Sequence, residues 1–571
     1  MSLKRKIKNI PSWVYYCLVL VLIIPAIIPF LKSSFYTFHD ETQIANLHQF
    51  ISAIKLGQFP PRWAPNMQFN YGSPFLQFYY QLPFYLAFIT NVIFGFSLVV
   101  SFKFIMVFSL LLGAFGIYFL ALKFTKPFQA VLASAIYSLA PYRAVVILVR
   151  GTLGEALAFG IFPWVILFLL NLQNKQTKKN LLGATLFIAL LALTHQLAIL
   201  LVLPFILIIT LGSSLILKKT KAFFYQLSSL VLGFGLSCFY LLPAIFEKRF
   251  LQTSSPFNFY DHFPFIKQLI YSPWGYGSSN WGMYDDMSFR LGIVQWLVVL
   301  AGIFIFVKII VKKQSKTSSR DLTKKTILGL TLFSFLASLF LMNIRSSFFW
   351  NIFPYTQLVQ FPWRLLMSAV LFSSFIFILL PFPEKLPNRL ILSTLILGFL
   401  LVPSFKYFQP GKVVDHQDNY FLHRYLPDQV LDEGETVSAD YLNHSEDYVP
   451  LPLTATRPKI LPTKKLTTFS NEAVVSLIDE NPFHYSANIS SIVSTEFTFH
   501  TFDFPGWTIY LNGEKISHQR NKIGAITFPV PEGENQLLIA YQNTPLRAFA
   551  NYLSVFFLGL IATILLKKKP L

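Results

Sequence analysis

Long apolar runs separated by short lysine-rich stretches constrain this chain more than any other feature. A helix that crosses the hydrocarbon core of a bilayer needs about 20 mostly apolar residues. Thirteen stretches approach that length, at residues 12–31, 82–101, 104–122, 127–147, 155–171, 181–197, 198–217, 223–243, 290–311, 325–342, 363–380, 388–404 and 548–566. The pattern predicts a polytopic α-helical membrane protein with about 12–14 transmembrane segments.

Charge and composition agree with this fold class. The 571 residues are 54% hydrophobic and only 13% charged, against about 25% charged in soluble chains. The net charge of +21 would suit a nucleic-acid-binding protein, but the lysines cluster between the apolar runs, as in Lys4-Arg5-Lys6, residues 175–179 and residues 567–569. This positive-inside pattern excludes nucleic acid as a partner and predicts that both termini are cytoplasmic. The two cysteines lie in apolar runs, so they provide no disulfide framework.

Two cytoplasmic termini require an even number of crossings, whereas thirteen segments are odd. The loops alternate consistently in both directions from the ends until residues 82–150. One of the three segments in that range is therefore expected to be short, re-entrant or wrongly placed.

The chain divides into three expected parts. Residues 1–404 form a transmembrane domain with a long first outer loop at 32–81, and residues 548–571 form a last helix with a basic tail. Residues 405–547 form a β-rich domain outside the membrane. Alternating segments at 495–502, 507–511, 523–530 and 536–540, with a hairpin turn at Asn512-Gly513, predict a small antiparallel sandwich.

His39-Asp40-Glu41 directly follows the first apolar segment on the expected outer side. Ionisable groups at a membrane interface are costly unless they are hydrated or used. One carboxylate could serve as a general base toward an acceptor hydroxyl. The alternative is that Asp40 only caps a helix starting near Thr42.

Two outer arginines are candidates for binding phosphate. Arg150 opens the stretch Arg150-Gly151-Thr152-Leu153-Gly154-Glu155, and Arg364 ends the stretch Phe361-Pro362-Trp363-Arg364. Arginine binds phosphate through paired hydrogen bonds. The alternatives are an Arg150–Glu155 salt bridge and simple snorkelling of Arg364 toward the interface.

Other candidates each allow a structural and a functional interpretation. His195, at a turn between two apolar segments, fits a structural hydrogen-bonding role better than a catalytic one. Asp285 and Asp286 could bind a divalent cation or be ordinary loop charges. The aromatic residues of the first outer loop fit either sugar stacking or an interfacial belt: Trp63, Tyr71, Tyr79 and Tyr80. No phosphate-binding glycine loop with its lysine, HExxH or GxSxG motif occurs.

An ordered set of short motifs resembles a known family. The motifs are HDE at 39–41, GQFPPRWAPNMQFNYGSPFLQFYY at 57–80, APYR at 140–143, RGTLGE at 150–155, LTHQ at 193–196, WGYG at 274–277, FPWR at 361–364 and RYLP at 424–427. In this order they resemble the bacterial membrane proteins labelled "6-pyruvoyl-tetrahydropterin synthase-related" and their YfhO-like relatives. The label itself does not describe this chain, because a pterin synthase needs a soluble fold with a histidine zinc site, and no His-x-His pair occurs here.

The resemblance implies the GT-C architecture of integral-membrane glycosyltransferases, in which an acid of the first outer loop is catalytic. That role falls on Asp40, with Glu41 second. The implied substrates are a polyprenyl-phosphate-linked sugar and a cell-envelope polymer as acceptor, outside the bacterial plasma membrane. The residues expected to bind substrate are His39, Arg62, Trp63, Tyr71, Arg150, Glu155, His195 and Arg364. No cofactor is certain, and a requirement for Mg²⁺ or Mn²⁺ is left open.

Two other functions compete with the transferase. A transporter or flippase for lipid-linked saccharides would carry charges at helix midpoints along a path, whereas the acids and arginines here concentrate near helix ends. A non-catalytic envelope scaffold would leave the ordered motifs of the membrane part without a role.

Overall fold

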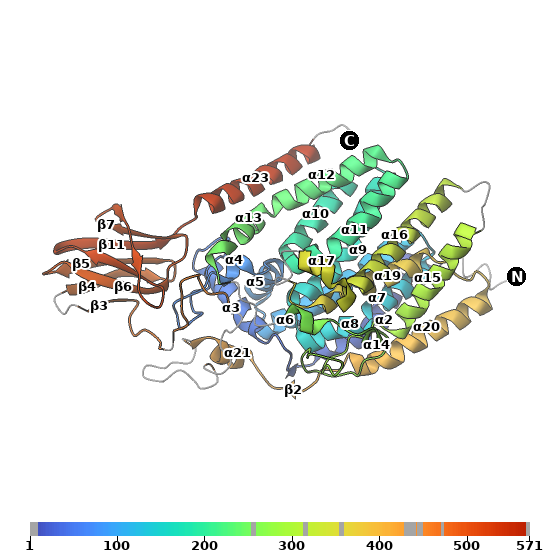
Figure 1. Ribbon diagram of the computed structural model, residues 1–571, viewed down its shortest axis with the longest axis horizontal. Helices are drawn as coiled ribbons and strands as arrows, with labels where there is room; N and C mark the ends of the chain where they lie inside the picture. Colours follow the sequence, from blue (N-terminus) through green and yellow to red (C-terminus); the bar gives the residue numbers. More distant parts are fainter. Residues whose placement is uncertain are drawn as a thin grey trace.

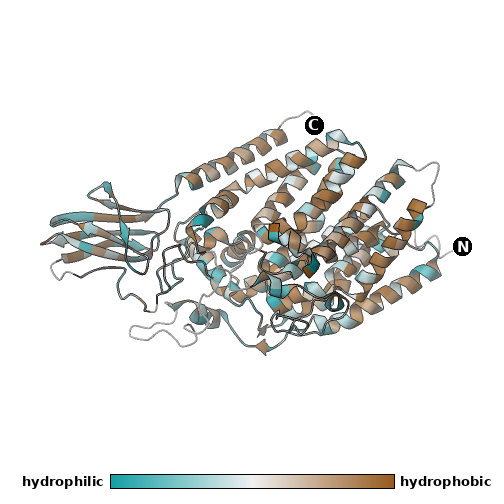
Figure 2. Ribbon diagram, in the orientation of Figure 1, coloured by the Kyte–Doolittle hydropathy of each residue, from teal (hydrophilic) through white to brown (hydrophobic). Residues whose placement is uncertain are grey.

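The computed structural model describes residues 10–252, 258–311, 318–352, 359–427, 441, 449–458, 460–469 and 473–566. Helices form an elongated bundle, and a group of β-strands lies at one end of it (Figure 1). The start of α2 (Ser12–Leu31) and the end of α23 (Pro545–Leu566) both lie away from the strands. Most of the length of the bundle helices has the colour of hydrophobic residues (Figure 2), as a helix in lipid requires.

The bundle contains long helices and bent ones. Besides α2 and α23, the long helices are α6 (Leu98–Leu122), α9 (Leu153–Asn174), α10 (Lys178–Thr194), α11 (Gln196–Ile216), α15 (Ile293–Val311), α16 (Ser319–Leu341), α19 (Leu366–Leu379) and α20 (Leu386–Tyr407). The bent pairs are α7 (Pro127–Ser138) with α8 (Pro141–Ala144) and the π-helix η2 (Val145–Arg150), and α12 (Thr220–Leu236) with α13 (Cys238–Phe246) and η3 (Glu247–Phe250). Within the described ranges, nine helices are long and apolar enough to cross a membrane, or up to eleven if each bent pair is one span.

In the region with the parity conflict, α5 (Leu82–Phe94) is a short apolar helix that belongs to neither bent pair. Its 13 residues extend about 20 Å, which is less than the roughly 30 Å of a hydrocarbon core. Gly95 ends it in the left-handed conformation, with φ 66°. The expected boundary between segments 82–101 and 104–122 was therefore wrong, because α6 already begins at Leu98. Without α5 the expected segments number twelve, whereas the described helices that are long and apolar enough number nine to eleven, so an even number of crossings stays a prediction.

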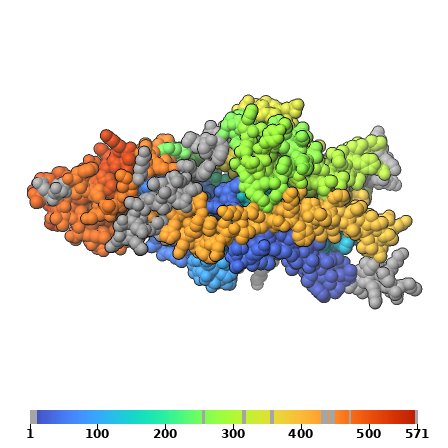
Figure 3. All heavy atoms as spheres, turned by 90° about the horizontal axis from the view of Figure 1, so that it is seen from below, coloured from blue at the N-terminus to red at the C-terminus, as the bar shows by residue number. Residues whose placement is uncertain are grey.

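Short elements of the first loop and of the segment after α20 lie between the bundle and the strands (Figure 1). They are α3 (Thr42–Lys55), α4 (Phe75–Phe78) and α21 (Asp418–Tyr425). Strand β1 (Phe35–Tyr36) pairs with β2 (Val413–Val414), which joins these two distant parts of the chain. Figure 3 shows the segment from α20 onward running along the bundle toward the strands.

The β-rich part is two antiparallel sheets. One has the order β3 (Leu466–Thr468), β6 (Thr495–Phe502), β10 (Ala525–Val530) and β9 (Gln519–Arg520). The other has the order β4 (Ala473–Asn481), β5 (His484–Ser491), β11 (Gly533–Tyr541), β7 (Trp507–Leu511) and β8 (Glu514–Ile516).

The expected fold class, a polytopic helical membrane protein with a β-rich C-terminal part, is confirmed. The strands at 495–502 and 507–511 match β6 and β7. Asn512 and Gly513 form the turn between β7 and β8 with φ of 52° and 84°, as a tight hairpin requires. Strands β3, β4 and β5 were not anticipated. The solvent side of β4 carries Val474, Leu477 and Ile478, which weakens the alternating pattern.

Candidate active site

The loop after α2 is bound to the turn that follows η2. The backbone N–H of His39 donates to the carbonyl of Val149 at 3.0 Å, and that of Asp40 donates to the carbonyl of Arg150 at 3.1 Å. Gly151 closes the turn with φ 67°, a conformation that glycine adopts readily. A Cβ atom on Gly151 would lie only 2.0 Å from the ring of Phe38. The two segments therefore meet at backbone distance, although more than 100 residues separate them.

Three buried charged groups lie behind this contact. Glu155, in the first turn of α9, accepts from Arg150 Nη1 at 2.5 Å, and its other oxygen lies 3.1 Å from Arg364 Nε. The side chains of Glu155, Arg150 and Arg364 are 0%, 6% and 8% exposed. The Arg150–Glu155 salt bridge that the sequence suggested as an alternative is thus present. One carboxylate serves two guanidinium groups, which leaves a positive charge in the cluster.

Aromatic and backbone groups hold the two arginines in place. The guanidinium of Arg150 lies 4.8 Å from the ring centroid of Trp363, a cation–π distance. Arg364 Nη1 donates to the carbonyl of Val359 at 3.2 Å. Neither arginine extends freely into solvent, so the snorkelling interpretation of Arg364 does not fit its 7% exposure.

Asp40 lies half-buried beside this cluster. Burial raises the pKa of its carboxyl above the usual value, and the positive charges of Arg150 and Arg364 oppose that rise. The Nε2 atom of His39 lies 3.0 Å from the carbonyl oxygen of Tyr276. Desolvation lowers the pKa of His39. This arrangement provides a carboxyl group of increased basicity in the field of two fixed guanidinium cations.

Two tyrosine hydroxyls share the environment of Asp40. Gln43 donates to the hydroxyl of Tyr79 at 2.7 Å and accepts from that of Tyr80 at 2.7 Å. Burial, and secondarily the charge of Asp40, raises the pKa of Tyr79 to about 12. Both phenols are therefore neutral at physiological pH and can act as hydrogen-bonding groups. Gln43 was not identified from the sequence, because a glutamine in an amphipathic helix has no distinguishing pattern.

His195 and Glu41 take more structural positions. The Nδ1 atom of His195 accepts from the backbone N–H of Ala198 at 3.3 Å, so it caps the N-terminus of α11. Its ring would lie 2.7 Å from a Cβ atom on Gly154, which places it next to Glu155. Glu41 is the residue before α3, and its charge acts on Tyr425 of α21. The charges of Arg150 and Arg364 act on Asp40, which makes Asp40 the stronger candidate for the catalytic acid.

The structure does not bring three other predicted substrate-binding residues to Asp40. Trp63 packs against Trp507 and Tyr541 of the β-rich part, with ring centroids 5.7 and 5.4 Å away. The hydroxyl of Tyr71 lies 3.0 Å from His500 Nδ1. Arg62 is 2% exposed, and it donates to the carbonyl of Phe239 and to the side chain of Asn551.

Arg62 lies near a second buried charge cluster that the sequence did not reveal. Glu247 is paired with Arg547 at 2.8 Å and accepts from Thr544 and Gln77. Glu247 and Arg547 each stand at the end of an apolar run, which was the only available signal. Pairing across 300 residues cannot be inferred from such positions.

Asp285 and Asp286 are bound within their own loop. Asp285 accepts from the backbone of Asn280 at 2.8 Å and from Gln268 at 2.6 Å, and Asp286 accepts from the side chain of Asn280 at 2.8 Å. Within the part of the chain that the structure describes, no three His, Cys, Asp or Glu side chains are grouped as a metal site would need. A divalent cation therefore stays a prediction.

The helical bundle, the charged cluster near its helix ends and the attached sheets define a polytopic membrane protein with a β-rich C-terminal part. Residues 76–410 match a family model described as "6-pyruvoyl-tetrahydropterin synthase related domain; membrane protein". The match spans more than half of the chain, and the protein belongs to this family, as the ordered motifs predicted.

No curated protein matches the chain. Among solved structures, it is similar to the arabinofuranosyltransferase AftD from Mycobacteria, with 13% identity and a TM-score of 0.44 over 72% of this chain and 28% of that one. It is also similar to the Archaeoglobus fulgidus oligosaccharyltransferase in the apo form, with 11% identity and a TM-score of 0.42 over 70% and 56%. A third is the Archaeoglobus fulgidus AglB in complex with an inhibitory peptide and a dolichol-phosphate, with 14% identity and a TM-score of 0.35 over 68% and 55%. The chain thus spans less than two thirds of the length of each.

Proposed function

We propose that this protein is a membrane glycosyltransferase of the GT-C type, which moves a sugar from a polyprenyl-phosphate donor to a hydroxyl of a cell-envelope glycan. The observation that carries the proposal is the position of Asp40 beside the Arg150–Glu155–Arg364 cluster. A carboxylate next to two fixed guanidiniums combines a base for the acceptor with positive charge for a departing phosphate.

In the proposed reaction, Asp40 takes the proton of the acceptor hydroxyl. The acceptor oxygen attacks the anomeric carbon, the bond from that carbon to the phosphate oxygen breaks, and the lipid phosphate leaves with the electron pair. Arg150 and Arg364 stabilise the charge that develops on the phosphate. Attack opposite to the leaving group inverts the anomeric carbon. Glu155 positions both arginines and takes no proton.

The same proposal sets the orientation in the membrane. Asp40 and the β-rich part lie outside the plasma membrane, and both termini lie in the cytoplasm. The lysine runs between the apolar segments support this, as does the position of the start of α2 and the end of α23 away from the strands (Figure 1). Nucleotide sugars are cytoplasmic, so a sugar used outside must already be carried across on a lipid.

The test compares envelope polymers and polyprenyl-phosphate sugars by mass spectrometry in four strains. One lacks the protein, and the others carry the wild type, Asp40→Asn or the matched control Asp415→Asn at equal membrane abundance. Asp415 directly follows β2, and its side chain is exposed and outside the Arg150–Glu155–Arg364 cluster. We expect the deletion and Asp40→Asn to lose a sugar mass from a polymer and to accumulate lipid-linked sugar, whereas Asp415→Asn behaves as wild type.

Two outcomes would contradict the proposal. If Asp40→Asn combined with Glu41→Gln retains full transfer, the mechanism is wrong. If the deletion alters the glycan while Asp40→Asn does not, the transporter function gains support instead.

A further inference from the structure

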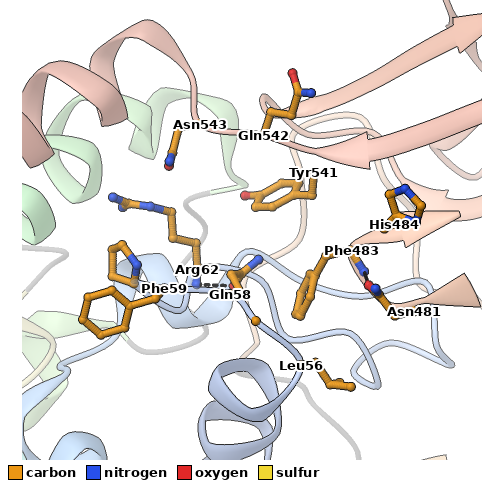
Figure 4. A pocket seen from close by; sticks show the side chains of 12 residues that line it. Leu56, Gln58, Phe59, Arg62, Asn481, Phe483, His484, Tyr541, Gln542 and Asn543 are labelled. Carbon is orange, nitrogen blue, oxygen red and sulfur yellow. Dashed lines mark hydrogen bonds between the residues drawn. The ribbon is translucent and has the colours of Figure 1, made fainter.

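A cavity of about 300 Å³ separates the first loop from the β-rich part. Residues 56–60 and Arg62 line one side, and the β4–β5 turn together with the end of β11 lines the other (Figure 4). This volume is at the lower end of the range for small-ligand sites, about 300–1,000 Å³. The cavity is distinct from the Asp40 cluster, whose residues do not line it.

The wall of the cavity contains buried donors without partners. Among the residues that the structure describes, none forms a hydrogen bond with Arg62 Nε, Arg62 Nη1 or Gln58 Nε2. The Oε1 atom of Gln58 accepts from the backbone of Arg62 at 2.6 Å and of Trp63 at 3.0 Å, so the orientation of its amide is set. A buried donor without a partner costs free energy. These donor atoms are covered by the lining, so they favour an acceptor-rich ligand in the cavity through their field and not by direct contact.

The positive charge of the buried arginines beside the cavity also favours a ligand with acceptor atoms. Arg62 and Arg547 are buried with one carboxylate, Glu247, which is paired with Arg547. Burial and the charge of Arg547 lower the pKa of Arg62 to about 10, so Arg62 is still protonated at neutral pH. The carboxylate of Asp479 lies 3.1 Å from Nδ1 of the lining residue His484. One guanidinium charge therefore stays uncompensated, and low polarity strengthens its field.

The remaining lining is suited to a sugar. Phe483 and Tyr541 provide aromatic rings, and Asn481, Gln542 and Asn543 are also lining residues (Figure 4). Amides bind hydroxyl groups, and aromatic rings pack against the apolar face of a sugar ring.

We propose that this cavity binds a saccharide that bears an oxyanion, either a carboxylate or a phosphate, with the anion toward Arg62. In the proposed transferase the bound chain is the acceptor, and this last role alone rests on the proposed function. Gln77 connects the two sites, since its backbone N–H donates to the carbonyl of Arg62 at 3.1 Å, and Tyr79 and Tyr80 beside Asp40 follow it directly.

The test measures binding to the full-length protein in nanodiscs of phosphatidylcholine, without any donor lipid. Fluorescence polarisation follows three labelled probes: a hexasaccharide of alternating N-acetylglucosamine and glucuronic acid, a neutral N-acetylglucosamine hexasaccharide, and a glycerol-phosphate hexamer. We expect at least one anionic probe to bind about tenfold more tightly than the neutral one, and binding to weaken as salt rises.

Variants locate the site. Arg62→Gln removes the positive charge, and Asn543→Trp fills the cavity with a larger side chain. Each variant should weaken the binding of the anionic probes about tenfold. Arg62→Lys retains the charge and serves where Arg62→Gln does not fold. Arg345→Gln and Gln519→Trp are matched controls at exposed positions outside the lining and should bind as wild type.

Equal affinity for neutral and anionic probes, or binding that Asn543→Trp leaves unchanged, would overturn the proposal. So would a result in which no probe binds and the variants change only the retention of phosphatidylglycerol by the protein, because the site would then hold a lipid headgroup. Since no donor is present, binding without transfer activity would contradict only the proposed function.

Discussion

Replacing Glu155 by glutamine should destabilise the protein strongly. Its carboxylate is fully buried and contacts Arg150 at 2.5 Å and Arg364 at 3.1 Å, whose side chains are 6% and 8% exposed. Removing one partner of a buried ion pair leaves an uncompensated charge, at a cost of about 3–5 kcal/mol. In Glu155→Gln, the guanidinium groups of Arg150 and Arg364 both lose their carboxylate partner. Asp40, the other acid near them, is only half-buried and does not replace the buried Glu155 carboxylate. We therefore expect Glu155→Gln to lower the free energy of unfolding by about 3–5 kcal/mol.

The assay is unfolding by sodium dodecyl sulfate in mixed micelles, followed by circular dichroism. A double-mutant cycle isolates the contact: Glu155→Gln with Arg364→Gln should lose about 1–3 kcal/mol less than the sum of the single variants, because the second change removes the stranded charge. Glu384 forms an exposed ion pair with Lys126, and Glu384→Gln is the control that should unfold like the wild type.

Two results would refute this reasoning. One is a loss below about 1 kcal/mol for Glu155→Gln, which is typical of exposed pairs. The other is strict additivity in the cycle, which would mean that Glu155 and Arg364 do not interact.

Three further predictions follow from local geometry. Gly151→Ala should lower the free energy of unfolding by about 1–3 kcal/mol more than Gly95→Ala does. Both glycines have positive φ, but only a Cβ atom at Gly151 would collide with Phe38. Thermal unfolding of the two variants checks this difference. Transfer activity should fall on acidification with an inflection above pH 3.8, because burial raises the pKa of Asp40 and only its ionised form accepts a proton; a pH–rate profile with an inflection at or below 3.8 would contradict it. Gly513→Ala should destabilise the β7–β8 hairpin by about 1 kcal/mol, since its φ is 84°; hydrogen exchange of the β8 amides measures it.

Much of the fold could be predicted because lipid and water each require a characteristic local pattern of apolar and polar residues. Lipid requires apolar helices of bilayer length, so the spans could be located from hydropathy alone. Alternation with period two predicted β6 and β7, and the Asn512-Gly513 pair predicted their turn. The residues at which helices end or bend could not be predicted as well from the sequence. The breaks at Gly95 and before Pro141 depend on backbone conformations that a run of apolar residues does not display.

The candidate site divides in the same way. Asp40, Arg150, Glu155 and Arg364 could each be selected from the sequence, because charges are rare in apolar surroundings and stand out. Which of them meet is a matter of tertiary packing. The chain pairs residues 39–40 with 149–150 through backbone hydrogen bonds, which brings the backbone of Asp40 to that of Arg150.

The sequence by itself determined which segments lie in lipid and which in water, and with this the membrane fold class. Its ordered motifs determined the family. Only the tertiary structure decided that Arg62 lines a cavity beside the β-rich part and that Trp63 packs against Trp507, so that neither joins the Asp40 cluster. The physical reason is that burial and hydropathy act residue by residue, whereas a charge pair such as Glu247 and Arg547 forms only after helices 300 residues apart have packed.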